Sequence, residues 1–469
     1  MPNPQVTEAF VNKFWDDEIV PTLIDYIRIP NKSPAFDPNW DANGHMEDAF
    51  QLAWKWIEAH PIPGMKTYQG RLEGRTPLIL LDIPGDLDKT ILLYGHLDKQ
   101  PEMSGWRADL GPWKPVYEDG KLYGRGGADD GYALFASMCA MMAMREQGVK
   151  LPRAVVMIEF SEESGSPDLP AYVDHFSAEI GEVDLVVCLD SGAGNYDQLW
   201  STTSLRGLVG GTVRVDVLEE GVHSGDASGI VPSSFRVLRQ LVARLEDENT
   251  GEIVPESLKV EIPEQRVAQA RRVADSLGEE LYRKYPFVQG MQPATDDPVA
   301  CILNRTWRAA LSYTGAEGLP PVQSGGNVLR PYSTLKLSLR LPPTLEGHEA
   351  QKVVEDILSR NPPYNAKITC EFEEAATGWN APPLADWLAD ALDEVSQTFY
   401  DKPALHMGEG GTIPFMGMLG EKFPKAQFVV TGVLGPNSNA HGPNEFLHVP
   451  YAKKLTCCVA HILAIHAAL

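Results

Sequence analysis

Two kinds of hydrophobic pattern alternate along the first part of the chain. Residues 6–29 and 46–60 carry apolar side chains three and four positions apart, which predicts helices, and Pro21 is expected to break or kink the first one. Short apolar runs bounded by turn residues predict buried strands at 77–83, 90–96, 153–160 and 184–189. The pattern is typical of an α/β fold whose mixed, mostly parallel sheet is covered by helices.

The pattern changes after residue 203, where strands alternate with amphipathic helices. The expected order is strand, helix, strand, strand, helix, strand, at 211–220, 233–248, 301–313, 334–343, 346–360 and 366–374. This order is the split βαβ arrangement of a ferredoxin-like α+β domain. Residues 250–300 are charged and partly helical, and their pattern indicates no function.

The first pattern returns near residue 380, with a helix predicted at 385–400, a buried strand at 426–434 and a helix at 451–469. A chain of 469 residues is too long for one ordinary core. We therefore expect a catalytic domain formed by residues 1–203 and 380–469, with residues 204–379 inserted as a second domain.

Composition restricts the class of partner. The formal charge of −24 argues against nucleic acid, because counterion release needs clusters of Lys and Arg, and it suits a protein that concentrates cations. No basic segment followed by an apolar run begins the chain, and no run of about 18 apolar residues occurs, so we expect a cytoplasmic protein without membrane contact. The six cysteines form no CxxC pair, which favours neither disulfides nor a thiolate zinc site.

Acidic and imidazole side chains follow three of the predicted strands. His96 and Asp98 come after one strand, Glu162 and Glu163 after the next, and Asp190 after the third. In open α/β sheets, binding and catalytic residues lie just beyond the carboxyl ends of the strands. These residue types bind divalent cations, and a second acid beside a ligand can take a proton from water.

A glycine-rich turn, LYGRGGADDG at 122–131, adds two adjacent carboxylates. Asp129 has two oxygens, so it can bridge two cations, and the glycines allow unusual backbone conformations. A nucleotide-binding turn is the rival interpretation, but Asp129 stands where the third glycine would fall, and acids repel phosphates. Alone, the stretch could equally be a solvated turn with a helix-capping aspartate.

The motifs GHLDKQP, YGRGGADDG, EESGS, LDSG, HSG and AHGPNEF, in this order, resemble those of the M20 metallopeptidases, above all the cytosolic nonspecific dipeptidase and carnosine dipeptidase branch. The resemblance covers nearly the whole chain. It implies two divalent metal ions per subunit, Zn or Mn. Asp129 would bridge them, with His96 and Asp190 on one ion and Glu163 and His441 on the other.

The same resemblance implies roles for further residues. Glu162 would be the general base, Asp98 would hold the His96 ring, and the peptide between Asp129 and Asp130 would be cis. In the inserted lid and dimerisation domain, the implied roles fall on His223, Arg340 and Asn327, and in the catalytic domain they fall on Gly411 and Thr412, at a helix start. His223 would reach the other subunit's substrate across a homodimer interface, and the other four would bind a substrate carboxylate. Without the resemblance, His223 is an ordinary turn residue and Arg340 an ordinary strand residue.

One departure from the family pattern is plain. The family commonly has a lysine and a glycine after the paired acids, and this chain has Gly131 and Tyr132 there. No metal ligand is affected, but the start of the following helix is expected to differ.

The sequence favours a metal-dependent hydrolase that cuts an amide bond in a small substrate with a free carboxylate, most readily a dipeptide. Asp190 and the EESGS motif match the dipeptidase version of the family pattern. The alternatives are an aminoacylase acting on N-acyl amino acids, a non-catalytic binding module with the same fold, and a nicotinamide dehydrogenase. The native metal, the substrate side chains and the state of the lid are not indicated.

Overall fold

The computed structural model describes residues 2–469 and divides the chain into two compact units. Unit 1 contains the chain up to Thr202, Ala381–His406 and Met418–Leu469, and unit 2 contains Thr203–Asn380 and Met407–Gly417. The segment Met407–Gly417 was expected in the first domain, and its grouping with unit 2 corrects that boundary. It is held there because Arg206 donates its backbone N–H to the Gly411 carbonyl at 3.0 Å, and the Thr412 hydroxyl donates to the Arg206 carbonyl at 2.5 Å.

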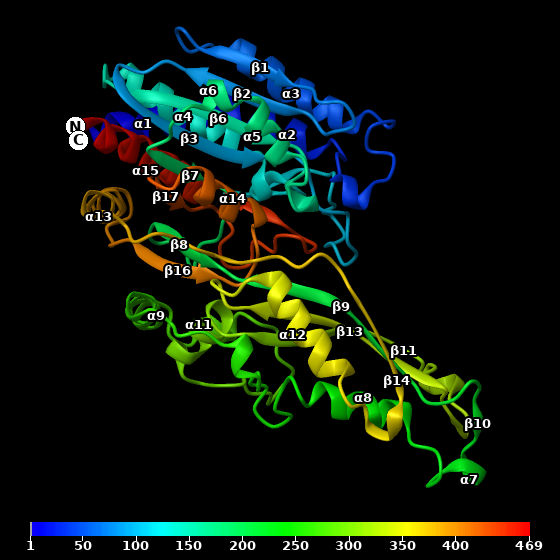
Figure 1. The fold of residues 1–469 in the computed structure, drawn as a ribbon. Helices are drawn as coiled ribbons and strands as arrows, with labels where there is room; N and C mark the ends of the chain where they lie inside the picture. The colour runs from blue at the N-terminus through cyan, green and yellow to red at the C-terminus, as the bar shows by residue number, and fades with distance from the viewer. Residues whose placement is uncertain (1) are drawn as a thin grey trace. The chain divides into compact units, whose positions relative to one another are not determined.

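Unit 1 is built on a mixed six-stranded sheet, as the apolar runs predicted (Figure 1). Its spatial order is β1-β2-β6-β3-β7-β17, in which β6, β3, β7 and β17 are parallel and β1 and β2 are antiparallel. The strands are β1 (Lys66–Gly70), β2 (Leu78–Ile83), β3 (Leu87–His96), β6 (Pro152–Glu159), β7 (Leu185–Cys188) and β17 (Gln427–Val430). Strands β2, β6 and β7 are almost entirely buried, and β3 is buried from Ile91 onward, which explains their continuous apolar runs.

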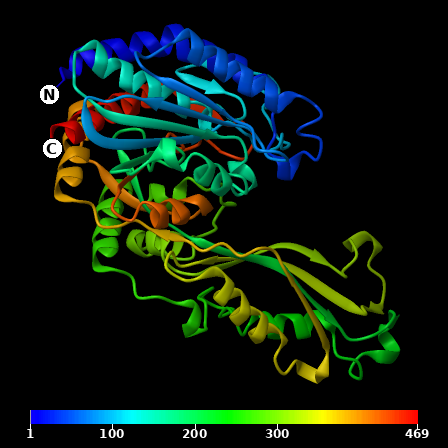
Figure 2. The same cartoon turned by 45° about the horizontal axis from the view of Figure 1, so that its top comes forward.

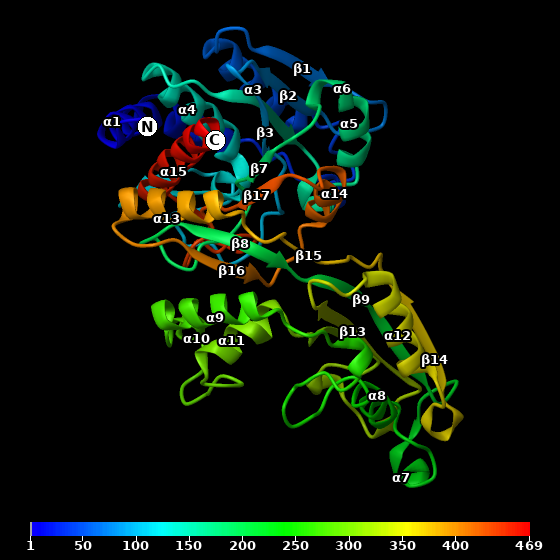
Figure 3. The ribbon, with the colours of Figure 1, turned by 60° about the vertical axis from the view of Figure 1, so that its left-hand side comes forward.

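Helices cover both faces of this sheet, with α4 and α15 on one side and α5 and α6 on the other (Figure 3). They are α1 (Pro4–Phe14), α2 (Val20–Ile27), α3 (His45–Ala59), α4 (Ala133–Glu146), α5 (Leu169–His175), α6 (Ser177–Ile180), α13 (Asp386–Tyr400) and α15 (Val449–Ala468). Helices α1 and α15 pack together, so the two ends of the chain lie side by side (Figure 2). A π-helical turn, Trp15–Ile19, interrupts the first helical region just before Pro21, which sits in the first turn of α2.

Unit 2 contains a four-stranded antiparallel sheet with the spatial order β11-β13-β9-β14. The strands are β9 (Gly207–Asp216), β11 (Ala310–Glu317), β13 (Tyr332–Leu341) and β14 (Lys367–Phe372). Helices α8 (Ser234–Val242) and α12 (Gly347–Ser359) contribute to the same apolar core as the inward side chains of β9 and β13. Along the chain the order is β9, α8, β11, β13, α12, β14.

The prediction of a strand over 301–313 is wrong for its first half. Residues Pro298–Thr306 form helix α11, and β11 begins only at Ala310. The helix forms because Asp297 accepts the Val299 N–H at 3.0 Å as an N-cap and Pro298 occupies the first turn. Helix α11 packs on α9 (Glu264–Leu277), and α10 (Glu280–Arg283) lies beside them (Figure 3).

Short elements complete the fold. The sequence patterns did not predict most of them, because two- to six-residue strands carry little periodicity. No helix among the described residues is long and apolar enough to cross a membrane. The short elements are β4 (Val116–Glu118), β5 (Lys121–Tyr123), β8 (Trp200–Leu205), β10 (Val222–His223), α7 (Ser224–Ala227), β12 (Val328–Leu329), β15 (Trp379–Asn380), β16 (Leu405–Glu409), α14 (Pro414–Lys422) and β18 (Phe446–His448).

Candidate metal centre

The carboxyl ends of three neighbouring parallel strands bring the predicted acids and histidine to one edge of the sheet in unit 1. In the ladder of β3, His96 is level with Glu159 of β6, and Tyr94 is level with Cys188 of β7. The segments after these strands carry Glu162, Glu163 and Asp190, so parallel pairing places all of them beside His96.

The glycine turn brings Asp129 to the same edge. Gly126 takes a left-handed conformation with φ of +83°, which favours glycine, and the Asp129–Asp130 peptide is cis, as the family resemblance implied. Gly131 donates its N–H to the Gly126 carbonyl at 2.8 Å. A Cβ at Gly131 would lie 2.5 Å from that carbonyl oxygen and 2.4 Å from the Tyr26 ring, so this chain has no room for a larger residue there.

Five side chains form two groups that share Asp129. In the first group, His96 Nε2 lies 3.5 Å from Asp129 Oδ1 and 3.8 Å from Asp190 Oδ2. In the second, His441 Nε2 lies 3.0 Å from Asp129 Oδ2 and 3.3 Å from Glu163 Oε2. Each oxygen of Asp129 therefore faces a different group, which is the arrangement that a bridging carboxylate needs.

The donor atoms fit divalent cations. Among the described residues, buried His96 Nε2 and Glu163 Oε1 have no hydrogen-bond partner, and such orphaned atoms are rare unless something else binds them. Burial and neighbouring carboxylates raise the pKa of Glu163, and burial raises the pKa of Asp190 to about 6. Positive charge at the centre would relieve this crowding of carboxylates. Carboxylate and imidazole donors without thiolate suit Zn or Mn.

Asp129 is held in its ionised form although its side chain is buried. Burial alone would raise its pKa, but the hydrogen bond from His441 and the positive charge of His441 and His96 bring the pKa well below its usual range. The carboxylate is thus ready to bind cations without first losing a proton.

Two acids border the groups without belonging to them. Asp98 Oδ1 lies 3.3 Å from His96 Nδ1, and the two Asp98 oxygens accept the backbone N–H groups of Glu162 at 3.1 Å and Glu163 at 3.0 Å. Asp98 therefore fixes the His96 ring and the glutamate loop together. Glu162 Oε2 lies 4.0 Å from His96 Nε2, and burial, followed by the charge of Asp190, raises the pKa of Glu162 well above normal.

The predicted residues of unit 2 fall into two places. Arg340 on β13 donates to the Thr412 hydroxyl at 3.1 Å, and Gly411 is next to Thr412 in the chain. His223 and Asn327 lie together elsewhere: the Ser224 N–H donates to the Asn327 carbonyl at 2.9 Å, and His223 pairs with Val328 between β10 and β12. His223 is solvent-exposed.

Comparison with known proteins identifies the family. The profile of Peptidase family M20/M25/M40 matches residues 92–465. The chain belongs to this peptidase family. It is 29% identical over 380 residues to the cysteinylglycine-S-conjugate dipeptidase of Corynebacterium striatum, covering 78% of this chain and 79% of that one. It is 26% identical over 417 residues to the Beta-Ala-His dipeptidase of Mus musculus, covering 85% and 82%.

Solved structures share the fold of this M20 family member. The crystal structure of human carnosine dipeptidase 1 aligns over 100% of both chains with a TM-score of 0.77 and 22% identity. The dipeptidase Dug1p of Saccharomyces cerevisiae aligns over 99% of both chains with a TM-score of 0.75 and 20% identity. At these identities the likeness establishes the fold.

Several residues that support the M20 centre were missed by sequence reasoning. Gln100 donates to Glu163 Oε2 at 2.6 Å, and Tyr132 donates through its hydroxyl to the Leu189 carbonyl at 2.5 Å, next to Asp190. Buried Arg125 pairs with Glu445 at 2.5 Å and donates to the carbonyl groups of His441 and Gly442. For Gln100, Arg125 and Glu445 the available signal was their place inside the GHLDKQP, YGRGGADDG and AHGPNEF motifs, whereas Tyr132 lies just after the second motif.

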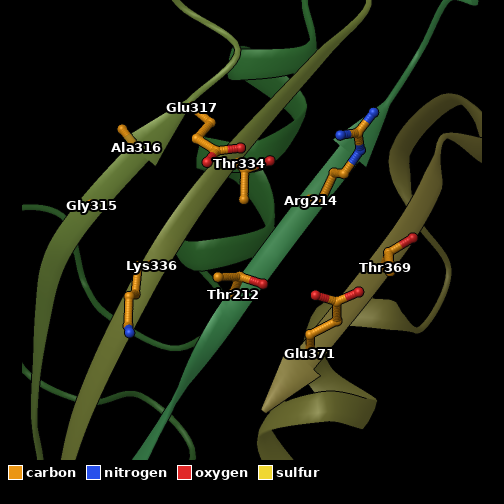
Figure 4. A pocket seen from close by; sticks show the side chains of 9 residues that line it. All are labelled: Thr212, Arg214, Gly315, Ala316, Glu317, Thr334, Lys336, Thr369 and Glu371. Atoms are coloured by element: carbon orange, nitrogen blue, oxygen red, sulfur yellow. The ribbon is translucent and has the colours of Figure 1, made fainter. Parts of the chain in front are cut away.

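A separate hollow on unit 2 contains none of the predicted site residues. It lies over the face of the four-stranded sheet opposite its apolar core, where alternate residues of the strands point away from that core (Figure 4). Its polar side chains are partly paired, as Arg214 with Asp216 and Lys336 with Glu373. The lining residues are Thr212, Arg214, Gly315, Ala316, Glu317, Thr334, Lys336, Thr369 and Glu371.

Proposed function

We propose that this chain is a dinuclear metallodipeptidase that hydrolyses the amide bond of small substrates with a free carboxylate. The observation that carries the proposal is the pair of donor groups sharing Asp129, with Glu162 beside them. The names of the relatives support the same reaction, because those proteins are dipeptidases.

Two cations, Zn or Mn, would be held by the chain's own donors. His96 and Asp190 would bind one, Glu163 and His441 the other, and Asp129 both. When bound, such ions polarise the substrate carbonyl and lower the pKa of a water molecule towards 7.

Glu162 supplies the proton transfers in this proposal. Its carboxylate lies at the rim of the first group without belonging to either, so it is available to take a proton from the attacking water and return it to the leaving amine. Burial and the charge of Asp190 raise the pKa of Glu162, which is the direction that makes its carboxylate a stronger base. Asp98 keeps Glu162 in place through the hydrogen bond to its backbone N–H.

We also propose that unit 2, Thr203–Asn380 with the added segment Met407–Gly417, is a ferredoxin-like lid and dimerisation domain. Its strand and helix order and its antiparallel sheet support this. Arg340, Thr412 and Gly411 would bind the substrate carboxylate, Arg340 by a two-pronged hydrogen bond, whereas Asn327 lies beside His223 and would act together with it.

His223 would act on the substrate of a second subunit. It lies near the end of β13 marked by Tyr332, whereas Arg340 is eight residues farther along that strand, which corresponds to roughly 27 Å. One chain therefore cannot offer His223 and Arg340 to the same small substrate, so a homodimer that exchanges His223 fits the geometry.

The cytoplasmic location of the protein stays a prediction, which cell fractionation tests.

A substrate screen decides between this function and its alternatives. Metal-free protein reloaded with Zn or Mn should hydrolyse dipeptides and leave N-acetyl amino acids largely intact. Hydrolysis of N-acetyl amino acids alone would identify an aminoacylase. If neither metal restores any hydrolysis, the fold serves as a binding module and the proposal is wrong.

A further inference from the structure

Unit 2 contains a group of positive side chains that the dipeptidase reaction does not explain. The cationic cluster consists of Arg206, Arg305, Arg340 and Lys284. Arg206 lies between β8 and β9, Arg305 on α11, Arg340 on β13 and Lys284 at the end of α10. Only Glu409 adds an opposing charge beside them among the described residues. A protein with a net charge of −24 thus gathers four cations around one acid.

The glycine at 410 allows two members of the cluster to approach each other. A Cβ at Gly410 would lie 3.2 Å from Arg206 Nη2 and 3.3 Å from Arg305 Cγ. Arg206 Nε also donates to the Gly410 carbonyl at 3.2 Å. A side chain at position 410 would therefore fill the space between the two arginines.

Among the described residues, the guanidinium groups of Arg206 and Arg340 have no carboxylate partner. Arg206 is only 8% exposed, and its hydrogen bonds go to the carbonyl groups of Gly410 and Asn304. Within residues 2–469, neither Arg206 nor Arg340 forms an ion pair, and Arg305 reaches Glu409 only at 3.8 Å. Burial and the charges of Arg340 and Arg305 lower the pKa of Arg206 to about 10. Positive charges that repel one another inside a protein are strongly stabilised by a bound anion.

The cluster offers more positive charge than one carboxylate requires. Arg340 and Thr412 are sufficient to bind the main-chain carboxylate of a dipeptide. Arg206 also fastens the segment of Gly410 to α11 through its two carbonyl contacts, which gives it a structural role. Arg305 contacts the same segment only through Met407 Sδ at 3.2 Å and Glu409 at 3.8 Å, and Lys284 lies within residues 250–300, the region for which the sequence indicated no function.

We propose that Arg305 and Lys284, next to Arg206, bind a second carboxylate: the side chain of a C-terminal aspartate or glutamate in the substrate. The main-chain carboxylate binds Arg340 and Thr412 at the same time. The chain therefore prefers dipeptides whose second residue is acidic. This inference rests on the proposed dipeptidase function and names its substrate class.

Paired peptides of nearly equal shape test the preference. We compare kcat/KM for Ala-Glu and Ala-Gln. The side chain of the second residue ends in a carboxylate in the first peptide and in an amide in the other. Native protein should favour Ala-Glu by about tenfold or more, mainly through KM, because a charged hydrogen bond in a partly buried site is lost with the amide. The ratio should fall towards one in Arg305→Gln and fall partly in Lys284→Gln.

A neighbouring arginine provides the control. Arg308 follows α11 but is exposed, and its guanidinium donates to Asn304 Oδ1 at 2.7 Å, so Arg308→Gln should keep the full preference. Equal kcat/KM for the two peptides in native protein, or an unchanged ratio in Arg305→Gln, would show that no second carboxylate is recognised.

A binding measurement separates this inference from the proposed reaction. Calorimetry with metal-loaded Glu162→Gln should show tighter binding of Ala-Glu than of Ala-Gln, and the difference should disappear when Arg305→Gln is added. If native protein cleaves no peptide but this binding difference is present, the reaction is wrong and the second-carboxylate site stands. If the two peptides bind equally, the site is wrong whatever the activity.

Discussion

Glu162 is the residue on which the proposed chemistry depends most. Glu162→Gln keeps the size of the side chain but removes its ability to accept a proton, so we expect kcat to fall by at least about 10²-fold. Both metals should remain bound, because Glu162 belongs to neither donor group. Steady-state kinetics and metal analysis check the two expectations. Glu394→Gln, at an exposed position of α13, is the control and should be fully active.

A Glu162→Gln variant with near-native turnover would remove the general-base role. Loss of metal together with activity would instead show that Glu162 is a ligand.

His461 should make the stability of the protein depend on pH. It is buried on α15 with Nε2 3.0 Å from the Thr7 hydroxyl, and burial lowers its pKa from 6.5 to about 4. Between these pH values the unfolded chain binds more protons than the folded one, so stability is lost as the pH falls from 6.5 towards 4. One such histidine contributes a slope of at most about 1.4 kcal/mol per pH unit.

Urea unfolding of native protein and His461→Gln at several pH values measures this slope. The free energy of unfolding of native protein should fall faster below pH 6.5 than that of the variant. Parallel curves would contradict the assignment.

Four of the five proposed ligands could be identified from the sequence because each one follows a buried strand or a glycine turn, whereas His441, in a polar loop, was assigned only by the family resemblance. His96, Asp129, Glu163 and Asp190 are acids or a histidine where apolar runs end, and such positions are visible in a sequence. The partners of these residues were not predictable. Whether Gln100 contacts Glu163 depends on how two loops approach each other in space, and a local sequence pattern does not predict that approach.

At the scale of elements, a buried ion pair connects the glycine turn to the loop that carries His441. Arg125 is 1% exposed and its partner Glu445 is 0% exposed, and Glu445 also accepts the Gly126 N–H at 2.9 Å. Arg125→Met would leave Glu445 buried without its partner, so we expect a loss of about 3–5 kcal/mol in the free energy of unfolding. Arg125→Met should also weaken metal binding by His441, because Arg125 donates to the His441 carbonyl.

Denaturant unfolding and metal titration check both effects. Arg107→Met is the matched control, since Arg107 pairs with Asp109 and Glu118 at the surface and should change stability by about 1 kcal/mol or less. Equal stabilities for the two variants would mean that the Arg125 pair does not fasten the loop.

The element predictions succeeded where the pattern was long and failed where local capping decided the outcome. Strands β2, β3, β6 and β7 were predicted from continuous apolar runs of four or more residues. The apolar run at 301–313 is equally suited to helix and strand, and Asp297 with Pro298 start a helix there instead. Two-residue strands such as β10 depend on their partner strand and have no pattern of their own.

At the scale of the whole molecule, the proposed exchange of His223 between subunits predicts complementation. His223→Ala should have low activity and retain its metals, and Glu162→Gln should be inactive. When the two are mixed under conditions that exchange subunits, hybrid dimers regain one complete site each. Random exchange should restore about a quarter of the activity of native dimers.

The restored activity is measured after mixing and compared with the sum of the two unmixed variants. Activity that stays at this sum, although exchange is demonstrated, would confine His223 to its own chain.

The domain arrangement was only partly predictable. The change of pattern near residues 203 and 380 marks where the chain passes between the two units. The return of Met407–Gly417 to unit 2 was not visible in the sequence, because it depends on hydrogen bonds of the Gly411 carbonyl and the Thr412 hydroxyl with the backbone of Arg206, about 200 residues earlier in the chain.

The central claim is that one carboxylate, Asp129, joins two cations while Glu162 stays free. Anomalous diffraction from crystals of Zn- or Mn-loaded protein tests it most directly. We predict two metal peaks per chain, about 3.5–4 Å apart, one beside each oxygen of Asp129, with Glu162 outside both coordination shells. A single peak, or two peaks that do not share Asp129, would contradict the claim.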